Sequence, residues 1–296
     1  MKKNVLTTLL LAAAAFGALS MTGCSGNSQP AQSNESSTTS SQTAVETTSA
    51  EDTPSDDLLA RIQEKGEIVI AMEGTWAPWT YHDEDDQLVG YDVEVGRKIA
   101  DKLGVEAAFV EGEWDGLLAG LDAGRYDIMV NGVEITDERA EKYDFTDPYA
   151  YIRTAVIVNG DNDEIQSYDD LDGKSTANTI SSTYAELAES YGAQVTGVDD
   201  LNQTFELLLS GRIDATLNAE VTYYDYMNAH PDANIKIAAL TEEASHVAIP
   251  LRKGGESERL RTAINQAITE LAESGELSEL SMKYFGSDIS EMPQGN

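Results

Sequence analysis

The sequence predicts an α/β protein of two lobes with a cleft between the ends of their strands. Two observations indicate this fold class. Apolar segments of strand length alternate with amphipathic segments of helical period, which is typical of sheets covered by helices. The pattern Gly-Arg-x-Asp also occurs twice, at Gly124 and at Gly211, each time between a predicted helix and a predicted strand. Such a repeat favours two similar halves.

The elements follow one another in the same alternation in both halves. In the first half we expect strands at 67–72, 105–110 and 126–130 and helices at 93–103 and 115–123. In the second half we expect helices at 183–190, 201–210 and 220–228, a long helix after Ser257 and a last helix at 277–284 that ends at Gly286. The long helix has apolar residues at helical spacing: Leu260, Ile264, Ala267, Ile268 and Leu271.

The two copies of the repeat predict that each half has a polar side chain at the end of a strand. Glycine ends each preceding helix, because it takes the left-handed conformation readily. Each copy then enters a short strand that leads to an asparagine, Asn131 or Asn218. Open α/β sheets bind ligands beyond the carboxyl ends of their strands, so we expect a cleft between the lobes. The chain is expected to cross near 151–157 and 243–249, which gives lobe one as 58–152 plus 247–296 and lobe two as 153–246.

The first 57 residues are expected to lie outside this fold. Two lysines precede a short apolar segment that leads to Cys24, the only cysteine in the chain. The segment ending in Met-Thr-Gly-Cys resembles a bacterial lipoprotein signal, which implies removal of residues 1–23 and lipidation of Cys24. A free thiol or an intermolecular disulfide is the alternative. Residues 24–57 have little to bury, which predicts a disordered, acidic, Ser/Thr-rich tether.

The formal net charge of −34 argues against nucleic acid as a partner, because so acidic a surface repels polyanions. The acidic clusters at 83–86 and 161–164 lack the spacing, central glycine and closing glutamate of a calcium loop. The three histidines are scattered along the chain. We therefore expect no metal and no cofactor.

Arg139 is the first candidate for ligand binding. It follows the apolar run 127–130 in what reads as an acidic loop at the end of a strand. A planar guanidinium can hold a small carboxylate by two parallel hydrogen bonds. The alternative is that Arg139 pairs with Glu138, Glu141 or Asp144 on a solvated face.

A helix start in the second half is the next candidate. Thr183 and Glu186 have the spacing of a capping box, and the free N–H groups at Ser182 and Thr183 would favour an anion. The alternative is a plain helix cap with no ligand.

Aromatic residues complete the picture of a small zwitterion site. All three tryptophans, Trp76, Trp79 and Trp114, lie at junctions between predicted elements of the first half. There an aromatic face can stack on a ligand side chain. Core packing is the alternative, above all for Trp79.

Together these segments resemble the polar amino acid-binding proteins that serve ABC importers, which have the type II periplasmic binding fold. This resemblance implies that each lobe is a mixed sheet flanked by helices and that two hinge strands join the lobes. The resemblance covers about residues 58–286 and rests on several segments taken together. They are EGTWAPWTY (73–81), LVGYDVEVGRKIADKLGV (88–105), EWDGLLAGLDAGRYDIMVNG (113–132), TDERAEKYDFTDPY (136–149), DLDGK (170–174), LLLSGRIDA (207–215) and ESGELSELSMKYFG (273–286).

The resemblance implies roles for individual residues. Arg139 would grip the α-carboxylate of the ligand, helped by the helix start at Ser182 and Thr183. Trp76 stands where the family places an aromatic ring over the ligand side chain. Glu73 and Trp114 stand where selectivity is often tuned. Asn131 and Gly132, at the strand end, are further ligand-binding candidates.

The chain departs from the family pattern at two positions. Glu134 stands five positions before the arginine, where the family often has a hydroxyl residue. Ala219 stands where the family often has the aspartate that binds the ligand ammonium. We expect Glu134 to take over the ammonium from the other wall of the cleft, with Glu220 or Asn218 as alternatives. In a further alternative Glu134 points to solvent and water fills the gap.

The expected function is capture of a polar amino acid by lobe closure and its delivery to an ABC permease, by a monomer attached outside the cell through a lipid anchor. The tail at 273–290 resembles that of cystine-binding members, which makes cystine the leading ligand. One alternative is an enzyme like cyclohexadienyl or arogenate dehydratase on the same fold, with Glu134 or Glu220 as general acid. Another is a ligand-sensing module for a membrane partner.

Overall fold

The computed structural model describes residues 57–293, all within one compact unit. The expected signal segment, Cys24 and the tether as far as residue 56 lie outside the described residues. In the part of the chain that is described, no helix is long and apolar enough to cross a membrane.

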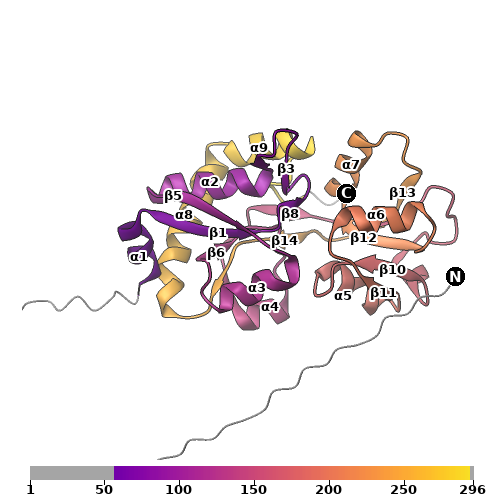
Figure 1. The fold of residues 1–296 in the computed structure, drawn as a ribbon, viewed down its shortest axis with the longest axis horizontal. Helices are drawn as coiled ribbons and strands as arrows, with labels where there is room; N and C mark the ends of the chain where they lie inside the picture. The colour runs from indigo at the N-terminus through magenta and orange to yellow at the C-terminus, as the bar shows by residue number, and fades with distance from the viewer. Residues whose placement is uncertain (1–56, 294–296) are drawn as a thin grey trace, which may run out of the picture. The chain divides into compact units, whose positions relative to one another are not determined.

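We use the name lobe one for two stretches of the chain built around a parallel sheet (Figure 1). The first stretch contains α1 (Leu58–Lys65), β1 (Glu67–Met72), β2 (Thr75–Trp76), β3 (Thr80–His82), β4 (Leu88–Val89), α2 (Tyr91–Leu103), β5 (Glu106–Glu111), α3 (Trp114–Asp122), β6 (Ile128–Met129), α4 (Asp137–Lys142), β7 (Tyr143–Phe145) and β8 (Ala150–Ile152). The second contains β14 (Ser245–Val247), β15 (Pro250–Arg252), η2 (Gly255–Ser257), α8 (Glu258–Glu273) and α9 (Glu276–Phe285). The strands β5-β1-β6 form the parallel sheet.

Lobe two is the stretch between these two, and it contains a mixed sheet. Its elements are β9 (Thr154–Asn159), η1 (Tyr168–Leu171), β10 (Ser175–Asn178), α5 (Thr183–Ser190), β11 (Gln194–Gly197), α6 (Leu201–Leu209), β12 (Ala215–Ala219), α7 (Glu220–Ala229) and β13 (Ile235–Leu240). The strand order is β11-β10-β12-β9-β13, in which β9 runs antiparallel to both of its neighbours.

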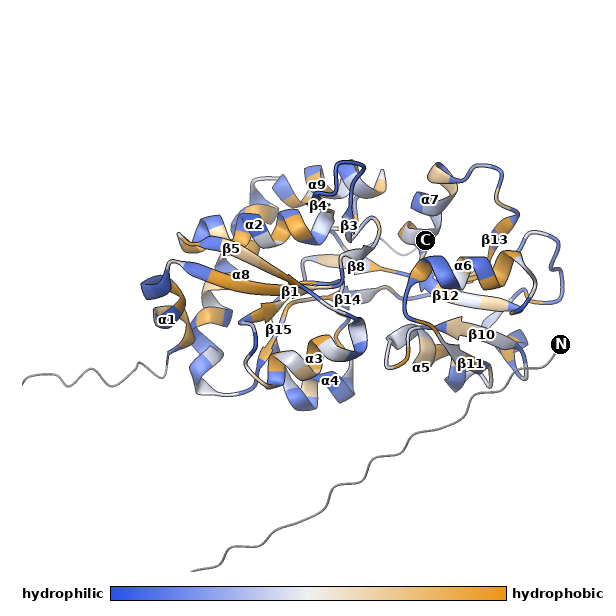
Figure 2. Ribbon diagram, in the orientation of Figure 1, coloured by the Kyte–Doolittle hydropathy of each residue, from blue (hydrophilic) through white to orange (hydrophobic). Residues whose placement is uncertain are grey.

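The core of lobe one follows from the alternation of side chains along β1. Ile68 and Ile70 face one side of the sheet and pack with the buried residues of α2 and α8. Ala71 faces the other side and packs with the buried residues of α3. Successive side chains of a strand point to opposite faces, so β1 needs apolar residues throughout. Figure 2 shows β1 and the middle of β5 in the hydrophobic colours.

The chain passes between the two sheets twice, on adjacent strands. β8 and β14 pair antiparallel, with Ala150 opposite Val247 and Ile152 opposite Ser245. These strands lie in the two segments expected to cross, near 151–157 and 243–249. Two adjacent connections of this kind allow rotation about one hinge axis while the lobes stay intact.

The Gly-Arg-x-Asp repeat forms the same structure in both lobes. Both glycines are left-handed, with φ of 66° and 68°. The Asp127 N–H donates to Val69 O at 2.9 Å, and Asp127 Oδ2 accepts from Val69 N at 2.8 Å. Asp214 forms the same two bonds with Ser175, also at 2.9 and 2.8 Å. Each aspartate therefore fixes the position of the following strand against its neighbour.

Most expected helices are confirmed, and two local expectations are wrong. All five apolar residues expected to face inward from α8 are buried. Arg139 lies on the short helix α4, not in a loop, because Thr136 Oγ1 caps that helix by accepting from Arg139 N at 3.2 Å. Thr183 does not cap α5, because Ser182 Oγ accepts from Ala185 N at 3.2 Å and takes that role.

Candidate functional site

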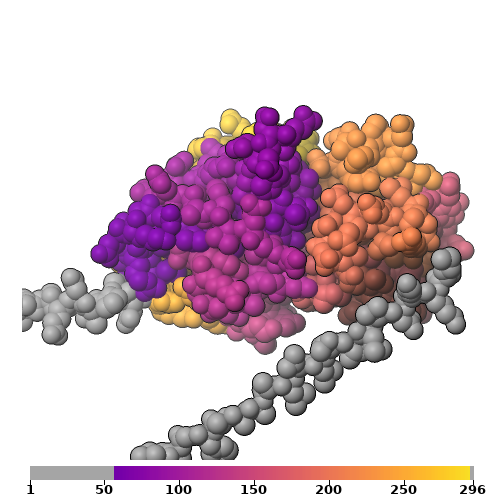
Figure 3. All heavy atoms as spheres, viewed as in Figure 1, coloured from indigo at the N-terminus to yellow at the C-terminus, as the bar shows by residue number. Residues whose placement is uncertain are grey.

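A cavity of about 590 Å³, counted to its open mouth, lies between the lobes. Lobe one contributes Glu73, Thr75, Trp76, Trp114, Gly132, Glu134 and Arg139. Lobe two contributes Asn178, Thr179, Ser182, Thr183, Tyr184, Leu201, Thr204 and Asn218. Nine of the eleven ligand-binding candidates from the sequence are therefore brought together. On the face shown in Figure 3, atoms of the two lobes meet along a seam.

Arg139 is the one positive side chain in the lining of this cavity. It is 7% exposed, and burial lowers the pKa of its guanidinium from the usual value, opposed by the Glu134 carboxylate. Its Nη1 donates to Glu134 O at 3.1 Å, and its Nη2 donates to Ser181 O at 3.3 Å in lobe two. The guanidinium lies over the Trp114 ring, 5.2 Å from the ring centroid. Carbonyls and an aromatic face thus hold the arginine in place.

Two acidic neighbours of Arg139 are engaged elsewhere. Glu138 pairs with Lys142 at 2.7 Å, and Asp144 accepts from Gly254 N at 3.2 Å. Within residues 57–293 no carboxylate forms an ion pair with Arg139. The solvated pairing that the sequence left open is therefore absent from this part of the chain.

Glu134 connects the two walls of the cavity. It is 6% exposed, and its Oε1 accepts from Thr183 Oγ1 of lobe two at 2.7 Å. Its backbone is held by an antiparallel bridge to Val247. Since Ser182 caps α5, the Thr183 hydroxyl is free to make this bond. The alternative in which Glu134 points to solvent does not describe this structure.

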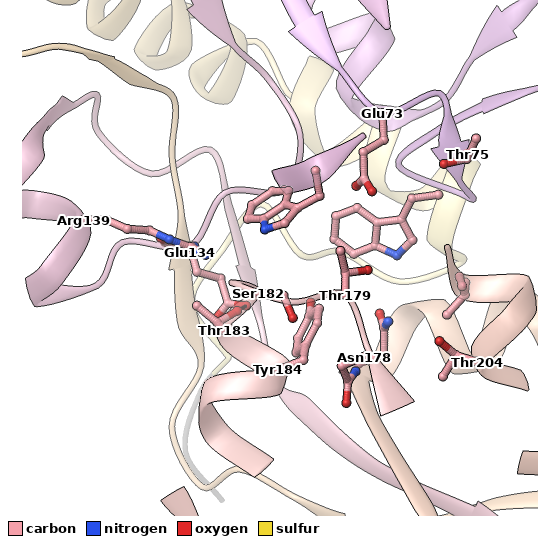
Figure 4. A pocket seen from close by; sticks show the side chains of 15 residues that line it. Glu73, Thr75, Glu134, Arg139, Asn178, Thr179, Ser182, Thr183, Tyr184 and Thr204 are labelled. Carbon is pink, nitrogen blue, oxygen red and sulfur yellow. Dashed lines mark hydrogen bonds between the residues drawn. The ribbon is translucent and has the colours of Figure 1, made fainter. Parts of the chain in front are cut away.

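Glu73 directly follows β1 and points into the cavity (Figure 4), and Asn131 holds it there. Asn131 Nδ2 donates to Glu73 Oε2 at 2.8 Å, and Asn131 Oδ1 accepts from Glu73 N at 2.7 Å. Burial raises the pKa of Glu73 to about 7, although the bond from Asn131 lowers it. Glu73 thus changes charge near neutral pH. Asn131 lies behind the cavity and supports it rather than lining it.

Gly132 is a position where only glycine fits. Its φ is 55°, and a Cβ there would lie 2.7 Å from the Trp76 ring. Its N–H donates to the fully buried Asp92 Oδ2 at 2.6 Å. The backbone between Asn131 and Glu134 is therefore held from behind by Asp92.

The aromatic residues divide into a cavity wall and a core. Trp76 lines the cavity and stacks on Trp79, with ring centroids 5.3 Å apart. It also meets Tyr184 of lobe two edge-on at 6.5 Å. Trp79 itself is fully buried and packs on Phe285 at 4.8 Å. The core-packing alternative therefore describes Trp79, and the cavity-wall role describes Trp76 and Trp114.

Glu220 does not line the cavity. Its carboxylate pairs with Arg153 at 2.9 Å, just after the crossing strand β8. Ala219, where the family often has an aspartate, is fully buried at the end of β12. Of the three residues considered for the ligand ammonium, Glu134 and Asn218 line the cavity and Glu220 does not.

Six lining residues were missed by reasoning from the sequence: Thr75, Asn178, Thr179, Tyr184, Leu201 and Thr204. Asn178 could have been found, since it ends a strand as Asn218 does. Its Nδ2 donates to Leu217 O at 2.7 Å, while its buried Oδ1 has no partner among residues 57–293. Tyr184 and Leu201 are apolar positions of helices and carry no such signal.

Comparison with known proteins gives a consistent result. Residues 68–287 match the bacterial extracellular solute-binding proteins, family 3. An L-cystine-binding protein of Bacillus subtilis is 40% identical over 236 residues, which are 79% of this chain and 87% of that protein. The L-cystine solute receptor of Neisseria gonorrhoeae, solved in the unliganded open conformation, is 39% identical with a TM-score of 0.56 over 79% of this chain and 99% of that one. An ancestral arginine-binding protein bound to arginine is 33% identical with a TM-score of 0.70, over 75% and 99%.

Proposed function

Since the chain belongs to the bacterial extracellular solute-binding proteins, family 3, we propose that it captures a polar amino acid, with cystine the leading candidate, and delivers it to an ABC permease. Its relatives include binding proteins of amino-acid ABC transporters. The lobes would close on the ligand, because only the closed form brings both walls into contact with it.

The burial of Arg139 without an ion pair among residues 57–293 is the observation that carries this proposal. A buried guanidinium that faces a cavity without an ion pair is unfavourable, and a ligand carboxylate supplies the missing charge. The two backbone carbonyls that hold Arg139 leave its remaining N–H donors for a ligand. We assign the α-carboxylate of the ligand to Arg139 and to the start of α5 at Ser182 and Thr183, where the Thr183 N–H is the donor, because the Ser182 N–H already donates to Thr179 O at 3.3 Å.

We assign the α-ammonium to Glu134. Its Oε1 accepts from Thr183, and none of the hydrogen bonds found among residues 57–293 ends on Oε2. The Glu134 carboxylate and the Arg139 guanidinium then lie close together, as do the ammonium and the carboxylate of an amino acid that they would bind. Asn218 is the neighbouring acceptor on the other wall.

The far end of the cavity supports cystine over a short amino acid. In Figure 4, Glu73, Asn178 and Thr204 lie across the cavity from Arg139. Cystine carries polar groups at both ends and an apolar disulfide between them. Trp76 and Trp114 would pack on the middle of such a ligand. The 40% identity to a cystine-binding protein also supports this choice.

The placement of the protein in the cell is likewise a proposal. We propose that residues 1–23 are removed, that Cys24 is lipidated, and that residues up to 57 tether a monomer to the outer face of the cell membrane. We also propose the lobe boundaries given from the sequence, although the second one, between residues 246 and 247, falls inside β14, which is described above with lobe one. Replacing Cys24 with serine should release the protein into the soluble fraction, and retention in the membrane would contradict the anchor.

We further propose that the chain is a binding protein and not an enzyme. Of the two general-acid candidates from the sequence, Glu220 pairs with Arg153 outside the cavity and Glu134 lines it. Absence of prephenate turnover would agree, and measurable turnover would overturn this part of the proposal. A sensing role would require a membrane partner that recognises the loaded form.

Calorimetric titration of the full-length chain tests the function as a whole. We expect one L-cystine to bind per chain, with higher affinity than L-arginine, L-glutamine and L-glutamate. Ligand at a hundred times its dissociation constant should stabilise the fold by about 2.7 kcal/mol. No heat and no rise in Tm with any amino acid would refute the proposal, provided that no ligand was carried through purification.

A further inference from the structure

Ser181 has an unusual backbone for its residue type. Its φ is 60°, and within residues 57–293 only one other residue that is not glycine, Asp86, has a positive φ. This left-handed conformation is unfavourable for a residue with a Cβ. Surrounding contacts must therefore hold Ser181 in place.

One of these contacts is a turn within lobe two, in which Ser182 N donates to Thr179 O at 3.3 Å, and two more come from the opposite lobe. Ser181 Oγ donates to Asp115 Oδ1 at 2.7 Å, and Ser181 O accepts from Arg139 Nη2 at 3.3 Å. Asp115 lies in the first turn of α3, next to the Trp114 that stacks on Arg139. Ser181 thus contacts lobe one through both its side chain and its carbonyl.

The Ser181–Asp115 bond differs from the other hydrogen bonds between the lobes near the cavity. Arg139, Glu134 and Thr183 line the cavity, and a ligand would compete for their polar atoms. Neither Ser181 nor Asp115 is among the lining residues. A ligand therefore does not replace this bond, whatever its side chain.

We propose that Ser181 and Asp115 are positioning residues that stabilise the closed arrangement of the lobes and hold Arg139 in its binding orientation. This rests on the proposed function, in which closure accompanies binding. The bond exists only when the lobes are together, so it adds the same free energy to the closed form of every complex. It slows ligand release without selecting among ligands.

The left-handed conformation makes this effect specific to Ser181. It turns the hydroxyl toward lobe one and the carbonyl toward Arg139, just before the cap of α5 at Ser182. Glycine at this position would keep the backbone and lose the hydroxyl. Alanine would lose the hydroxyl and keep the unfavourable backbone.

Four variants of the full-length chain test the proposal by stopped-flow kinetics. Ser181→Ala, Ser181→Gly and Asp115→Ala should each raise the ligand dissociation rate about three- to tenfold, the range expected for one hydrogen bond. They should change the association rate less than twofold. The factor should be the same for L-cystine and for any weaker amino acid ligand.

The fourth variant, Asp115→Asn, is the conservative rescue. Its amide oxygen still accepts from Ser181, so its dissociation rate should stay within twofold of wild type. Ser167→Ala is the matched control, because it removes an exposed serine–aspartate bond within lobe two, to Asp170 at 2.9 Å. Loss of binding in Asp115→Asn equal to that in Asp115→Ala, or an equal effect of Ser167→Ala, would overturn the proposal.

A second measurement needs no ligand. Spin labels at Glu141→Cys and Glu189→Cys, in full-length chain carrying Cys24→Ser, report the distance between α4 and α5. Ser181→Ala should move the distance distribution of the ligand-free protein to longer values, and Asp115→Asn should not. An unchanged distribution in Ser181→Ala refutes the positioning role even if amino acids bind. A shifted distribution with no binding by any amino acid refutes the proposed function instead.

Discussion

Replacement of Glu134 by glutamine removes one charge from the cavity and little else. The side chain keeps its shape, and a glutamine oxygen can still accept from Thr183 Oγ1, which lies 2.7 Å from Glu134 Oε1. The Glu134 carbonyl that holds Arg139 Nη1 at 3.1 Å belongs to the backbone and is unaffected. Any loss of binding therefore reports the charge of the carboxylate, which acts on the ligand ammonium and also on Arg139.

The expected loss follows from the chemistry of that contact. A hydrogen bond to a charged group contributes about 1.5–3 kcal/mol, against about 0.5–1.5 kcal/mol for a neutral one. The difference of about 1–2 kcal/mol corresponds to a dissociation constant about 5- to 30-fold higher. Calorimetric titration of the full-length chain with L-cystine measures it.

Two controls separate the ammonium contact from a general disturbance. Glu138→Gln changes an exposed glutamate of α4 that pairs with Lys142, and it should alter affinity less than twofold. The ligand 3,3′-dithiodipropionate has the carbon chain of cystine without its amino groups. Glu134→Gln should lower the affinity for cystine and leave the affinity for dithiodipropionate unchanged. Equal weakening of both ligands, or unchanged cystine affinity, would refute the assignment.

Three further outcomes are expected. Arg139→Lys should weaken L-cystine binding about 10- to 100-fold in the same titration, because lysine cannot form two parallel hydrogen bonds with a carboxylate; the exposed Arg125→Lys in the same lobe should stay within twofold. Burial raises the pKa of Asp92 to about 7, although bonds from Tyr149 and Gly132 lower it, whereas in the unfolded chain it is about 3.9. The folded protein therefore holds an extra proton between about pH 4 and pH 7, and its stability falls as the pH rises through that window. Between pH 5 and pH 8 the free energy of unfolding of Asp92→Asn, measured in urea, should fall by about 2–3 kcal/mol less than that of wild type. An identical pH dependence in variant and wild type would contradict this. Asp214→Ala should lower the free energy of unfolding by about 2 kcal/mol, because Ser175 N loses a charged acceptor; an unchanged urea midpoint would show that the repeat contributes nothing to stability.

Local patterns were sufficient for much of the fold. The five apolar residues of α8 recur at helical spacing and all are buried. The glycine of each Gly-Arg-x-Asp copy ends a helix, and the aspartate that follows bonds the next strand in both lobes. These features depend on residues a few positions apart, which is the range over which helix and turn preferences act.

Local patterns also misplaced some residues. Thr183 and Ser182 are both good helix caps, and the structure uses Ser182. Nothing near Glu220 in the sequence indicates that it forms an ion pair with Arg153, because the two residues are 67 positions apart. Tyr184 reads as an ordinary helix residue, and it lines the cavity only because α5 faces the other lobe.

The sequence by itself determined the α/β class, the two similar halves and the group of residues that meet at the strand ends. Each of these follows from periodicity, glycine placement or motif, and so from short-range physics. Only the tertiary structure decided which of these groups touch: Glu134 with Thr183, Arg139 with Ser181, and Ser181 with Asp115. Those partners come from different lobes, and a hydrogen bond requires donor and acceptor within about 3 Å. That distance is set by how the two lobes pack, which no local segment encodes.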